Sequence, residues 1–241
     1  MLKRVAEPKA ADPLLEAEQY HAMDHSSANE VFVRDFLDWI GEPKLDPEAP
    51  TGVLDLGCGP GDILRRLAEA LLGDDPNRPA ARRGLRMVGI DASPDAISLA
   101  SDDLALSTVD EIIHLDVHDV TDLEPWDDGF ADWVLSNTVV HHVDDPKAMI
   151  CEAHRLAASG GRVFIRDLAR PADEALVETL VERYSSQEAP EAQQLFRQSL
   201  HAAYRVDEVQ AWVDDCLPAD INAEIGMTSD RHWTLRIHKI Q

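Results

Sequence analysis

Basic residues are scarce in this chain. Of its 241 residues, 22 are lysine or arginine and 46 are aspartate or glutamate, so the formal net charge is −24 at pH 7. A protein that binds nucleic acid needs an electropositive surface that neutralises phosphates, and we therefore expect no nucleic-acid partner. The negative field suits a cationic or neutral ligand. Adaptation to a saline environment would also explain the acidity, and the sequence does not decide between the two.

Long apolar runs are absent as well. No stretch approaches the roughly 18 residues of a membrane-spanning helix, and residues 1–8 lack the apolar segment of a secretory signal, so we expect no membrane partner. Cysteine occurs only as Cys58, Cys151 and Cys216. An odd number of cysteines without metal-type spacing indicates reduced thiols, a cytoplasmic protein and no dedicated metal site.

One segment says more about function than any other. Residues 53–62 read Val-Leu-Asp-Leu-Gly-Cys-Gly-Pro-Gly-Asp, an apolar strand that runs into a glycine-rich turn, and the helical stretch 63–72 follows. Glycine lets the backbone adopt positive φ angles and leaves no Cβ in the path of a flat ligand. A strand, a glycine turn and a helix start in this order are typical of the first βα turn of a doubly wound α/β fold, where nucleotides bind.

The spacing of the glycines indicates which nucleotide binds. A dinucleotide fingerprint has the form G-x-G-x-x-G, whereas this turn reads G-x-G-x-G and has Asp62 where the third glycine would stand. An aspartate there would repel a pyrophosphate but not a cationic ligand. The stretch 54–61 resembles motif I of the class I S-adenosylmethionine (SAM) dependent methyltransferases. Two alternatives remain: an NAD(P)-dependent Rossmann oxidoreductase, and a non-catalytic SAM-binding or interaction module.

The resemblance implies a set of cofactor-binding residues at successive strand ends. Two further apolar strands end in acids, Asp91 and Asp116, and a polar loop at 73–84 separates the first of them from the glycine turn. In the family, the first acid accepts the ribose hydroxyls, the second accepts the adenine amino group, and the residue after it packs on the adenine ring. The implied residues for SAM, and for its product S-adenosylhomocysteine (SAH), are Asp55, Gly57, Cys58, Gly59, Asp91, Ala92, Asp116, Val117 and Asn137.

The segment 130–143 resembles the family's motif IV strand and the loop that follows it. It has no proline until Pro146, so it lacks the Pro-Pro-aromatic and Pro-Cys patterns of enzymes that methylate nucleobases. A small-molecule acceptor is therefore expected. His141 and His142 follow the strand, and because imidazole titrates near neutral pH either could act as a general base.

The pattern of elements predicts an α/β fold: a doubly wound, seven-stranded, mostly parallel sheet of Rossmann-like methyltransferase type, with a C-terminal antiparallel hairpin strand and a helical lid. We expect one domain over 1–241, divided into an N-terminal helical lid (1–45), a SAM-binding core (50–170), a helical insertion (172–203), and a C-terminal helix and hairpin (206–241). Expected helices lie at 13–25, 27–41, 63–72, 146–158, 172–185, 190–203 and 206–215. Expected strands lie at about 52–57, 86–91, 112–117, 131–136, 162–167, 219–228 and 231–239.

The acceptor site is predicted less sharply than the cofactor site. In class I enzymes the N-terminal helices and the insertion after the fifth strand usually cover the acceptor. The lid and substrate candidates are Tyr20, His21, Arg166, Asp167, His201 and Tyr204. Arg166 in particular could fix a carboxylate. The acceptor atom (oxygen, nitrogen or carbon), the acceptor itself and the oligomeric state stay open.

Overall fold

The computed structural model describes residues 2–8, 12–21, 23, 25–73, 82–218 and 221–240. Its centre is a seven-stranded sheet in the order β3-β2-β1-β4-β5-β7-β6. The strands are β1 (Thr51–Leu56), β2 (Leu85–Asp91), β3 (Ile113–Val117), β4 (Ala131–Asn137), β5 (Ala157–Leu168), β6 (Asn222–Met227) and β7 (His232–His238). β1 to β5 pair in parallel, and β7 pairs antiparallel with β5 and β6. The predicted fold class, including the C-terminal hairpin, is confirmed.

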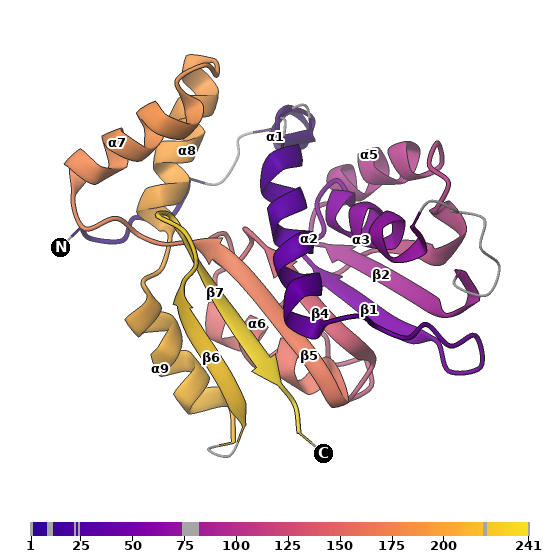
Figure 1. Ribbon diagram of the computed structural model, residues 1–241. Helices are drawn as coiled ribbons and strands as arrows, with labels where there is room; N and C mark the ends of the chain where they lie inside the picture. The colour runs from indigo at the N-terminus through magenta and orange to yellow at the C-terminus, as the bar shows by residue number, and fades with distance from the viewer. Residues whose placement is uncertain are drawn as a thin grey trace.

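Helices cover both faces of the sheet (Figure 1). One face carries α2 (Ser26–Ile40), α3 (Asp62–Leu72) and α5 (Pro94–Leu104), and the other carries α6 (Pro146–Leu156) and α9 (Val206–Cys216). Because parallel strands are buried on both faces, they read as nearly continuous apolar runs, and the last four residues of β1 are all buried. The switch in strand order between β1 and β4 places the glycine turn where such folds bind ligands.

The second N-terminal helix belongs to the core. Phe32 and Phe36 of α2 are fully buried and pack edge-on against Phe164 of β5, with ring centroids 5.1 and 5.6 Å away. Burial of one such ring contributes on the order of 1.5–3 kcal/mol. Helix α2 is therefore a fixed layer on the sheet. Within the predicted lid region 1–45 it follows α1 (Pro13–His21).

The insertion after β5 forms a helix pair with a small core of its own. It consists of α7 (Glu174–Ser185) and α8 (Pro190–Ala202), and it lies beyond the sheet, next to the N-terminal segment (Figure 1). The buried residues of this cluster are Leu168, Val177, Leu180, Val181, Leu200 and Ala203. We call residues 2–8 the N-terminal strap, because they run beside this pair: Leu2 donates to the Ala172 carbonyl and Val5 to the His201 carbonyl, both at 3.0 Å.

Three elements differ from the sequence prediction. Helix α5 was not expected, although its start carries a usable signal: Pro94 stands at the first helical position, and the Ser93 side chain accepts from the Ala96 amide. The fifth strand starts at Ala157 rather than at residue 162, and a short 3-10 helix, η1 (Asp110–Ile112), precedes β3. The other predicted boundaries agree to within a few residues.

The cysteines correct a prediction. Cys151 of α6 and Cys216 of α9 form a disulfide, with their Cα atoms 5.5 Å apart, and Cys58 is a buried free thiol. The expectation of three reduced thiols is therefore wrong for two of them. Sixty-five residues separate the pair in sequence, and helix packing brings them together on one face of the sheet, which no local pattern reveals.

None of the helices among the described residues is long and apolar enough to cross a membrane.

Candidate functional site

The glycine turn after β1 is held against the neighbouring strand. The amides of Gly57 and Cys58 both donate to the Ile90 carbonyl, at 2.8 and 2.9 Å. Gly57 has a φ of +73°, and a Cβ built on it would lie 2.5 Å from both γ-methyl groups of Val139. Glycine is therefore required here both for backbone conformation and for space, because the loop after β4 closes directly over the turn.

Asp55 is a buried carboxylate with one oxygen that lacks a hydrogen-bond donor. Its side chain is about 1% exposed, and no donor among the described residues reaches its Oδ2 atom. Burial, together with the nearby charge of Asp91, raises the pKa of Asp55 to about 7. A buried carboxylate left in this state fits a ligand that brings a positive charge to the glycine turn.

Asp91 stands at the mouth of the same turn. Its Oδ2 accepts from the Gly59 amide at 3.0 Å and its Oδ1 from the Ser93 amide at 2.9 Å. Each carboxylate oxygen has a second lone pair, so both can still accept from a pair of ribose hydroxyls. Ala92 lies between these contacts and is exposed.

The end of β3 lies beside the end of β2, since Val117 pairs with Asp91 in the sheet register. Val117 is 40% exposed, which is unusual for an apolar residue at this edge. The Asp116 carboxylate accepts from the Val117 amide at 2.8 Å and lies 3.3 Å from His118 Nε2. The three side chains predicted for ribose and adenine thus line one continuous edge of the sheet.

Asp91→Ala should weaken SAM binding by about 2 kcal/mol or more, because the ribose hydroxyls lose a charged acceptor. Asp116→Ala should cost less, since adenine also stacks on a side chain. Isothermal titration calorimetry with SAM measures both. Asp102→Ala, on an exposed position of α5, is the matched control. Unchanged affinity in a folded Asp91→Ala protein would contradict the ribose assignment.

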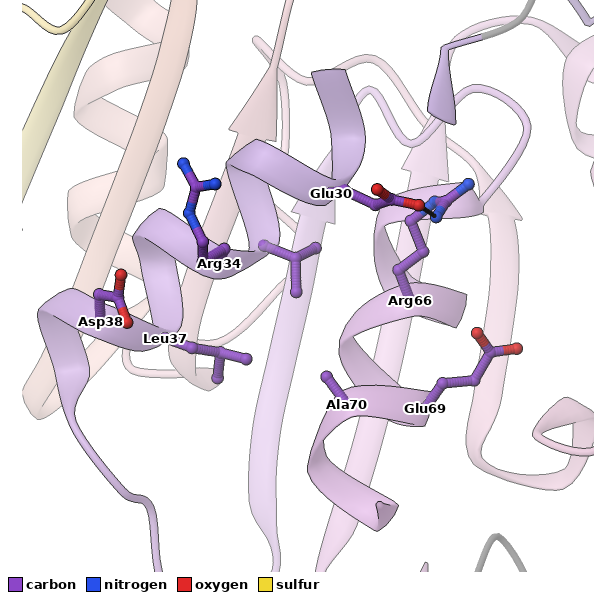
Figure 2. A pocket seen from close by; sticks show the side chains of 8 residues that line it. Glu30, Arg34, Leu37, Asp38, Arg66, Glu69 and Ala70 are labelled. Carbon is purple, nitrogen blue, oxygen red and sulfur yellow. Dashed lines mark hydrogen bonds and ion pairs between the residues drawn. The ribbon is translucent and has the colours of Figure 1, made fainter. Parts of the chain in front are cut away.

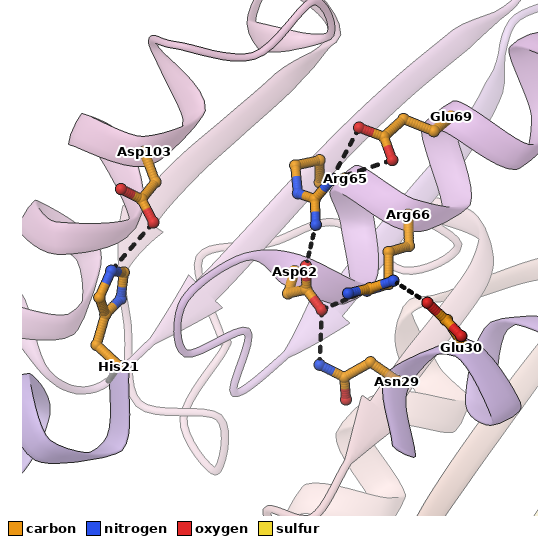
Figure 3. Close-up of polar contacts among 8 residues, drawn as sticks. All are labelled: His21, Asn29, Glu30, Asp62, Arg65, Arg66, Glu69 and Asp103. Atoms are coloured by element: carbon orange, nitrogen blue, oxygen red, sulfur yellow. Dashed lines mark hydrogen bonds and ion pairs between the residues drawn. The ribbon is translucent and has the colours of Figure 1, made fainter. Parts of the chain in front are cut away.

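A polar network closes the helix side of the turn (Figure 3). Asn29 of α2 donates to Asp62 at 2.9 Å and accepts from Asn137 of β4 at 3.3 Å. Arg66 donates to Asp62 at 2.5 Å, and Arg65 forms a further short contact to it. The charge of Asp62 is thus compensated by two arginines, which weakens the sequence argument that it would repel a pyrophosphate.

Asn29 is a site-forming residue that the sequence prediction missed. It is buried in α2, and its amide joins the strand end that carries Asn137 to the helix start that carries Asp62. The only sequence signal was a polar residue on the apolar face of an amphipathic helix.

The backbone is strained where the chain leaves β4. Thr138 has a φ of +63°, the only positive φ of a non-glycine residue in the described part of the chain, and a β-branched residue rarely adopts it. Its amide donates to the Arg166 carbonyl at 2.8 Å. Such strain costs on the order of 1–3 kcal/mol and clusters at functional sites. The strained residue leads directly to the two predicted histidines.

His141 is held by Asp167 in a fully buried pair. The imidazole Nδ1 lies 2.6 Å from Asp167 Oδ1, and the His141 amide donates to Oδ2 at 2.9 Å. The Leu168 amide also donates to the same carboxylate. Because the carboxylate is an acceptor, Nδ1 carries a proton, and in the neutral imidazole Nε2 then carries a lone pair. Asp167, predicted to touch the acceptor, instead orients His141.

His142 is paired with the N-terminal strap. Its Nδ1 lies 2.5 Å from Glu7 Oε2, and its side chain is 46% exposed. Ser199 of α8 donates to Glu7 Oε1 at 2.6 Å. Burial alone would raise the pKa of Glu7, but the hydrogen bond and the charge of His142 are the main effects that lower it, to about 2. Glu7 therefore ties the strap and α8 to the loop after β4.

Tyr20 of α1 lies over the glycine turn. Its Cε1 atom is 3.7 Å from the position of a Cβ on Gly59, and its ring stacks on His25 at 4.5 Å between centroids. The ring is 40% exposed, yet burial at its hydroxyl end and the charges of Asp91, Asp167 and Glu7 raise the pKa of Tyr20 to about 12. Tyr20 thus covers the glycine turn from α1, close enough to Asp91, Asp167 and Glu7 for their charges to act on its hydroxyl.

The other predicted acceptor residues are already engaged by protein partners. Arg166 pairs with Asp35 of α2 at 2.8 Å and donates to Thr234 at 3.0 Å; it is buried and fastens α2 to the sheet, so the expected role in fixing an acceptor carboxylate is not supported. His21 lies 3.0 Å from Asp103 of α5, and His201 lies 3.4 Å from Glu174 of α7. Tyr204 is buried under the Arg4 guanidinium, 4.1 Å from its ring centroid.

Two surface cavities lie on the helix side of the glycine turn. A groove of about 470 Å³ between α2 and α3 is lined by charged side chains such as Glu30, Arg34 and Arg66 (Figure 2). It contains none of the predicted cofactor residues. A cavity of about 360 Å³ lies beside the glycine turn, between His21, Gly61 and Leu115. The strand ends that carry Asp55, Asp91 and Asp116 therefore define the candidate donor site better than either cavity does.

Comparison with known proteins shows the family to which the chain belongs. A family profile described as "Methyltransferase domain" matches residues 48–218. The chain therefore belongs to the methyltransferase family, as its motifs predict, and SAM is the methyl donor of this class.

Individual relatives match different shares of the chain. Ajmaline N-methyltransferase of Rauvolfia serpentina is 31% identical over 137 residues, which cover 54% of this chain and 42% of that protein; the chain thus spans less than half of the length of that relative. A ubiquinone biosynthesis O-methyltransferase of Pseudomonas paraeruginosa is 28% identical over 204 residues, 83% of this chain and 78% of that one.

Solved structures share the fold at low sequence identity. The plantazolicin methyltransferase BamL, in complex with SAH and a triazolic desmethylPZN analog, superposes with a TM-score of 0.69 at 14% identity, covering 98% of this chain and 92% of that one. A SAM-dependent methyltransferase from Aquifex aeolicus gives 0.64 at 15% identity, covering 96% and 100%.

Proposed function

We propose that the protein transfers the methyl group of SAM to a small-molecule acceptor and releases SAH. The observation that carries the proposal is the buried Asp55 carboxylate, whose Oδ2 has no hydrogen-bond partner among the described residues, next to a glycine turn flanked by Asp91, in a chain of the methyltransferase family. The relatives named above methylate nitrogen or oxygen according to their names, and these two acceptor atoms have the best support here.

The proposed mechanism relies mainly on placement. The sulfonium of SAM is already activated, so an in-line displacement needs the donor and acceptor held at the right distance and angle. We propose that α1, with Tyr20, and the α7–α8 pair cover the site and keep water from it. A hydroxyl acceptor must also lose a proton, and we propose that this activation depends on His141 and His142.

The pH dependence of SAM binding tests the cofactor site. At pH 6 Asp55 is largely protonated, because its pKa is about 7, and a bound cation favours the ionised form. SAM should therefore bind more tightly as the pH rises from 6 to 8, and binding near pH 6.5 should release a proton. Calorimetry in buffers of different ionisation enthalpy measures this release.

SAH and an Asp55 variant are the controls for this experiment. SAH lacks the sulfonium charge and should show a smaller dependence on pH, and Asp55→Asn should remove the difference between the two ligands. Tight binding of NADH without any heat from SAM would instead support the oxidoreductase alternative. SAM that binds but never becomes SAH with any amine or phenol tested would support the non-catalytic alternative.

His141→Asn and His142→Asn should each lower kcat about 100-fold with a hydroxyl acceptor, the usual size of an acid–base contribution. SAM affinity should stay within about twofold. His238→Asn is the control, because His238 lies opposite Arg162 in the middle of β5, away from the carboxyl end of the strand that carries Asp167. Steady-state kinetics with an acceptor found by screening phenols and amines provides the measurement. Full activity in both variants would show that acceptor activation does not use the loop after β4.

The remaining predictions concern the surroundings of the enzyme. We retain the prediction of a cytoplasmic location and of no nucleic-acid partner. Disulfides are uncommon in reducing compartments, so the pairing of Cys151 and Cys216 argues against a cytoplasmic location.

A further inference from the structure

We propose that Glu7, His141 and His142 bind a divalent transition-metal ion, with Zn²⁺ as the best fit. One ligand atom from each side chain lies within 4.8 Å of the other two, and this is the only such group of three or more among the residues that the structure describes. The metal site is argued from the positions of these side chains. Only the location of the acceptor, at the loop after β4, rests on the proposed function.

The strongest observation is the state of His141 Nε2. The side chain is about 1% exposed, and Nε2 is buried without a hydrogen-bond partner. It faces Glu7 Oε1 at 3.9 Å, beyond hydrogen-bonding distance. A buried lone pair with no partner is costly, and a metal ion between the nitrogen and the carboxylate would satisfy both.

A second set of contacts orients the ligands as metal sites require. Asp167 accepts from His141 Nδ1 and so directs the Nε2 lone pair toward Glu7, which is the carboxylate–histidine–metal arrangement of known sites. Ser199 holds one oxygen of Glu7 at 2.6 Å. The supporting groups are therefore present in addition to the ligands.

The donor set selects the metal. Two imidazoles and one carboxylate favour zinc or its neighbours over Mg²⁺ or Ca²⁺, which prefer oxygen ligands. Ligand atoms of a tetrahedral zinc lie about 3.3 Å apart. The 2.5 Å contact between His142 and Glu7 must therefore lengthen by about 0.8 Å and lose its shared proton, while the 3.9 Å contact shortens.

Three protein ligands leave one position of the ion open. An acceptor hydroxyl bound there would have a lowered pKa. Its proton would pass to solvent, its oxygen would attack the methyl carbon of SAM, and the C–S electron pair would leave with sulfur as SAH. The ion would thus explain how activation of the acceptor depends on both histidines. It would also link the N-terminal strap to the loop after β4.

Metal binding to the tag-free full-length protein tests the inference without any acceptor. After dialysis against a chelator, titration with ZnCl₂ should show one ion per chain, and CoCl₂ should give the intense visible spectrum of four-coordinate Co²⁺. Glu7→Gln and His142→Asn should weaken Zn²⁺ binding at least 100-fold, and Asp167→Asn, which acts through His141, by about 10–100-fold. His238→Asn should bind as the wild type does.

Circular dichroism checks that each variant is folded. The cobalt spectrum of the wild-type protein tests the metal site even if a variant fails to fold. No stoichiometric ion in the wild type, or variants that bind zinc as well as the wild type, would overturn the inference. Full methyl transfer in the presence of chelator would also overturn its catalytic part and leave the proposed function intact. Zinc binding without any SAM binding would support the metal site and contradict the proposed function.

Discussion

Gly57→Ala should abolish measurable SAM binding and lower the free energy of unfolding by about 3 kcal/mol. The φ of +73° costs an L-residue on the order of 1–2 kcal/mol, and the new methyl group would lie 2.5 Å from both γ carbons of Val139, a degree of overpacking that costs about 1–3 kcal/mol. The turn can relieve the contact only by moving away from the loop after β4, which displaces the cofactor amides. Urea unfolding and calorimetry with SAM measure the two effects.

Gly160→Ala separates the two costs. Gly160 has a similar φ of +80°, but a Cβ there would meet nothing within 4 Å. This variant should lose only about 1–2 kcal/mol and bind SAM normally. In the double variant with Val139→Ala, Gly57→Ala should regain part of its stability. A Gly57→Ala protein no less stable than Gly160→Ala would mean that the loop yields easily and that the close contact is unimportant.

Reduction of the Cys151–Cys216 disulfide should lower the free energy of unfolding by about 4 kcal/mol. The bond closes a loop of 65 residues, and the chain-entropy relation gives a value of this size for such a loop. It joins α6 to α9 on one face of the sheet. Urea denaturation with and without a phosphine reductant measures the change.

A Cys151→Ser, Cys216→Ser double variant is the matched control. It should be less stable than the oxidised wild type by a similar amount and should not respond to the reductant. If the reductant destabilises this variant equally, the effect has another origin. If it leaves the wild type unchanged, the two thiols are not linked in solution.

The parts of the site that follow from consecutive residues were predictable. The glycine turn with Asp55 and the acids Asp91 and Asp116 each stand at the end of a recognisable apolar strand, and parallel pairing brings such ends to one edge. The register confirms this neighbourhood for Asp91 and Val117. Local sequence is sufficient here because the sheet itself supplies the long-range order.

The side-chain partners on the acceptor side were not predictable in this way. Glu7 lies 134 and 135 residues before the two histidines, and only the path of the strap brings it to His142. Asp167 and Arg166 were both expected to face the acceptor. Asp167 contacts His141 and Arg166 contacts Asp35, because neighbouring residues of a strand point to opposite faces of the sheet. The choice of partner depends on tertiary packing that spacing does not encode.

The separate core of the α7–α8 pair has an evolutionary consequence. Its buried residues pack mainly on one another and on Leu2 and Phe196, with only Leu168 drawn from the sheet. Mutations on the outer surface of this pair can therefore accumulate with little effect on the strands that carry the donor residues. Because we propose that this pair covers the acceptor, we expect acceptor range to diverge by change in this one module, while the strands that hold the methyl donor stay under stricter selection.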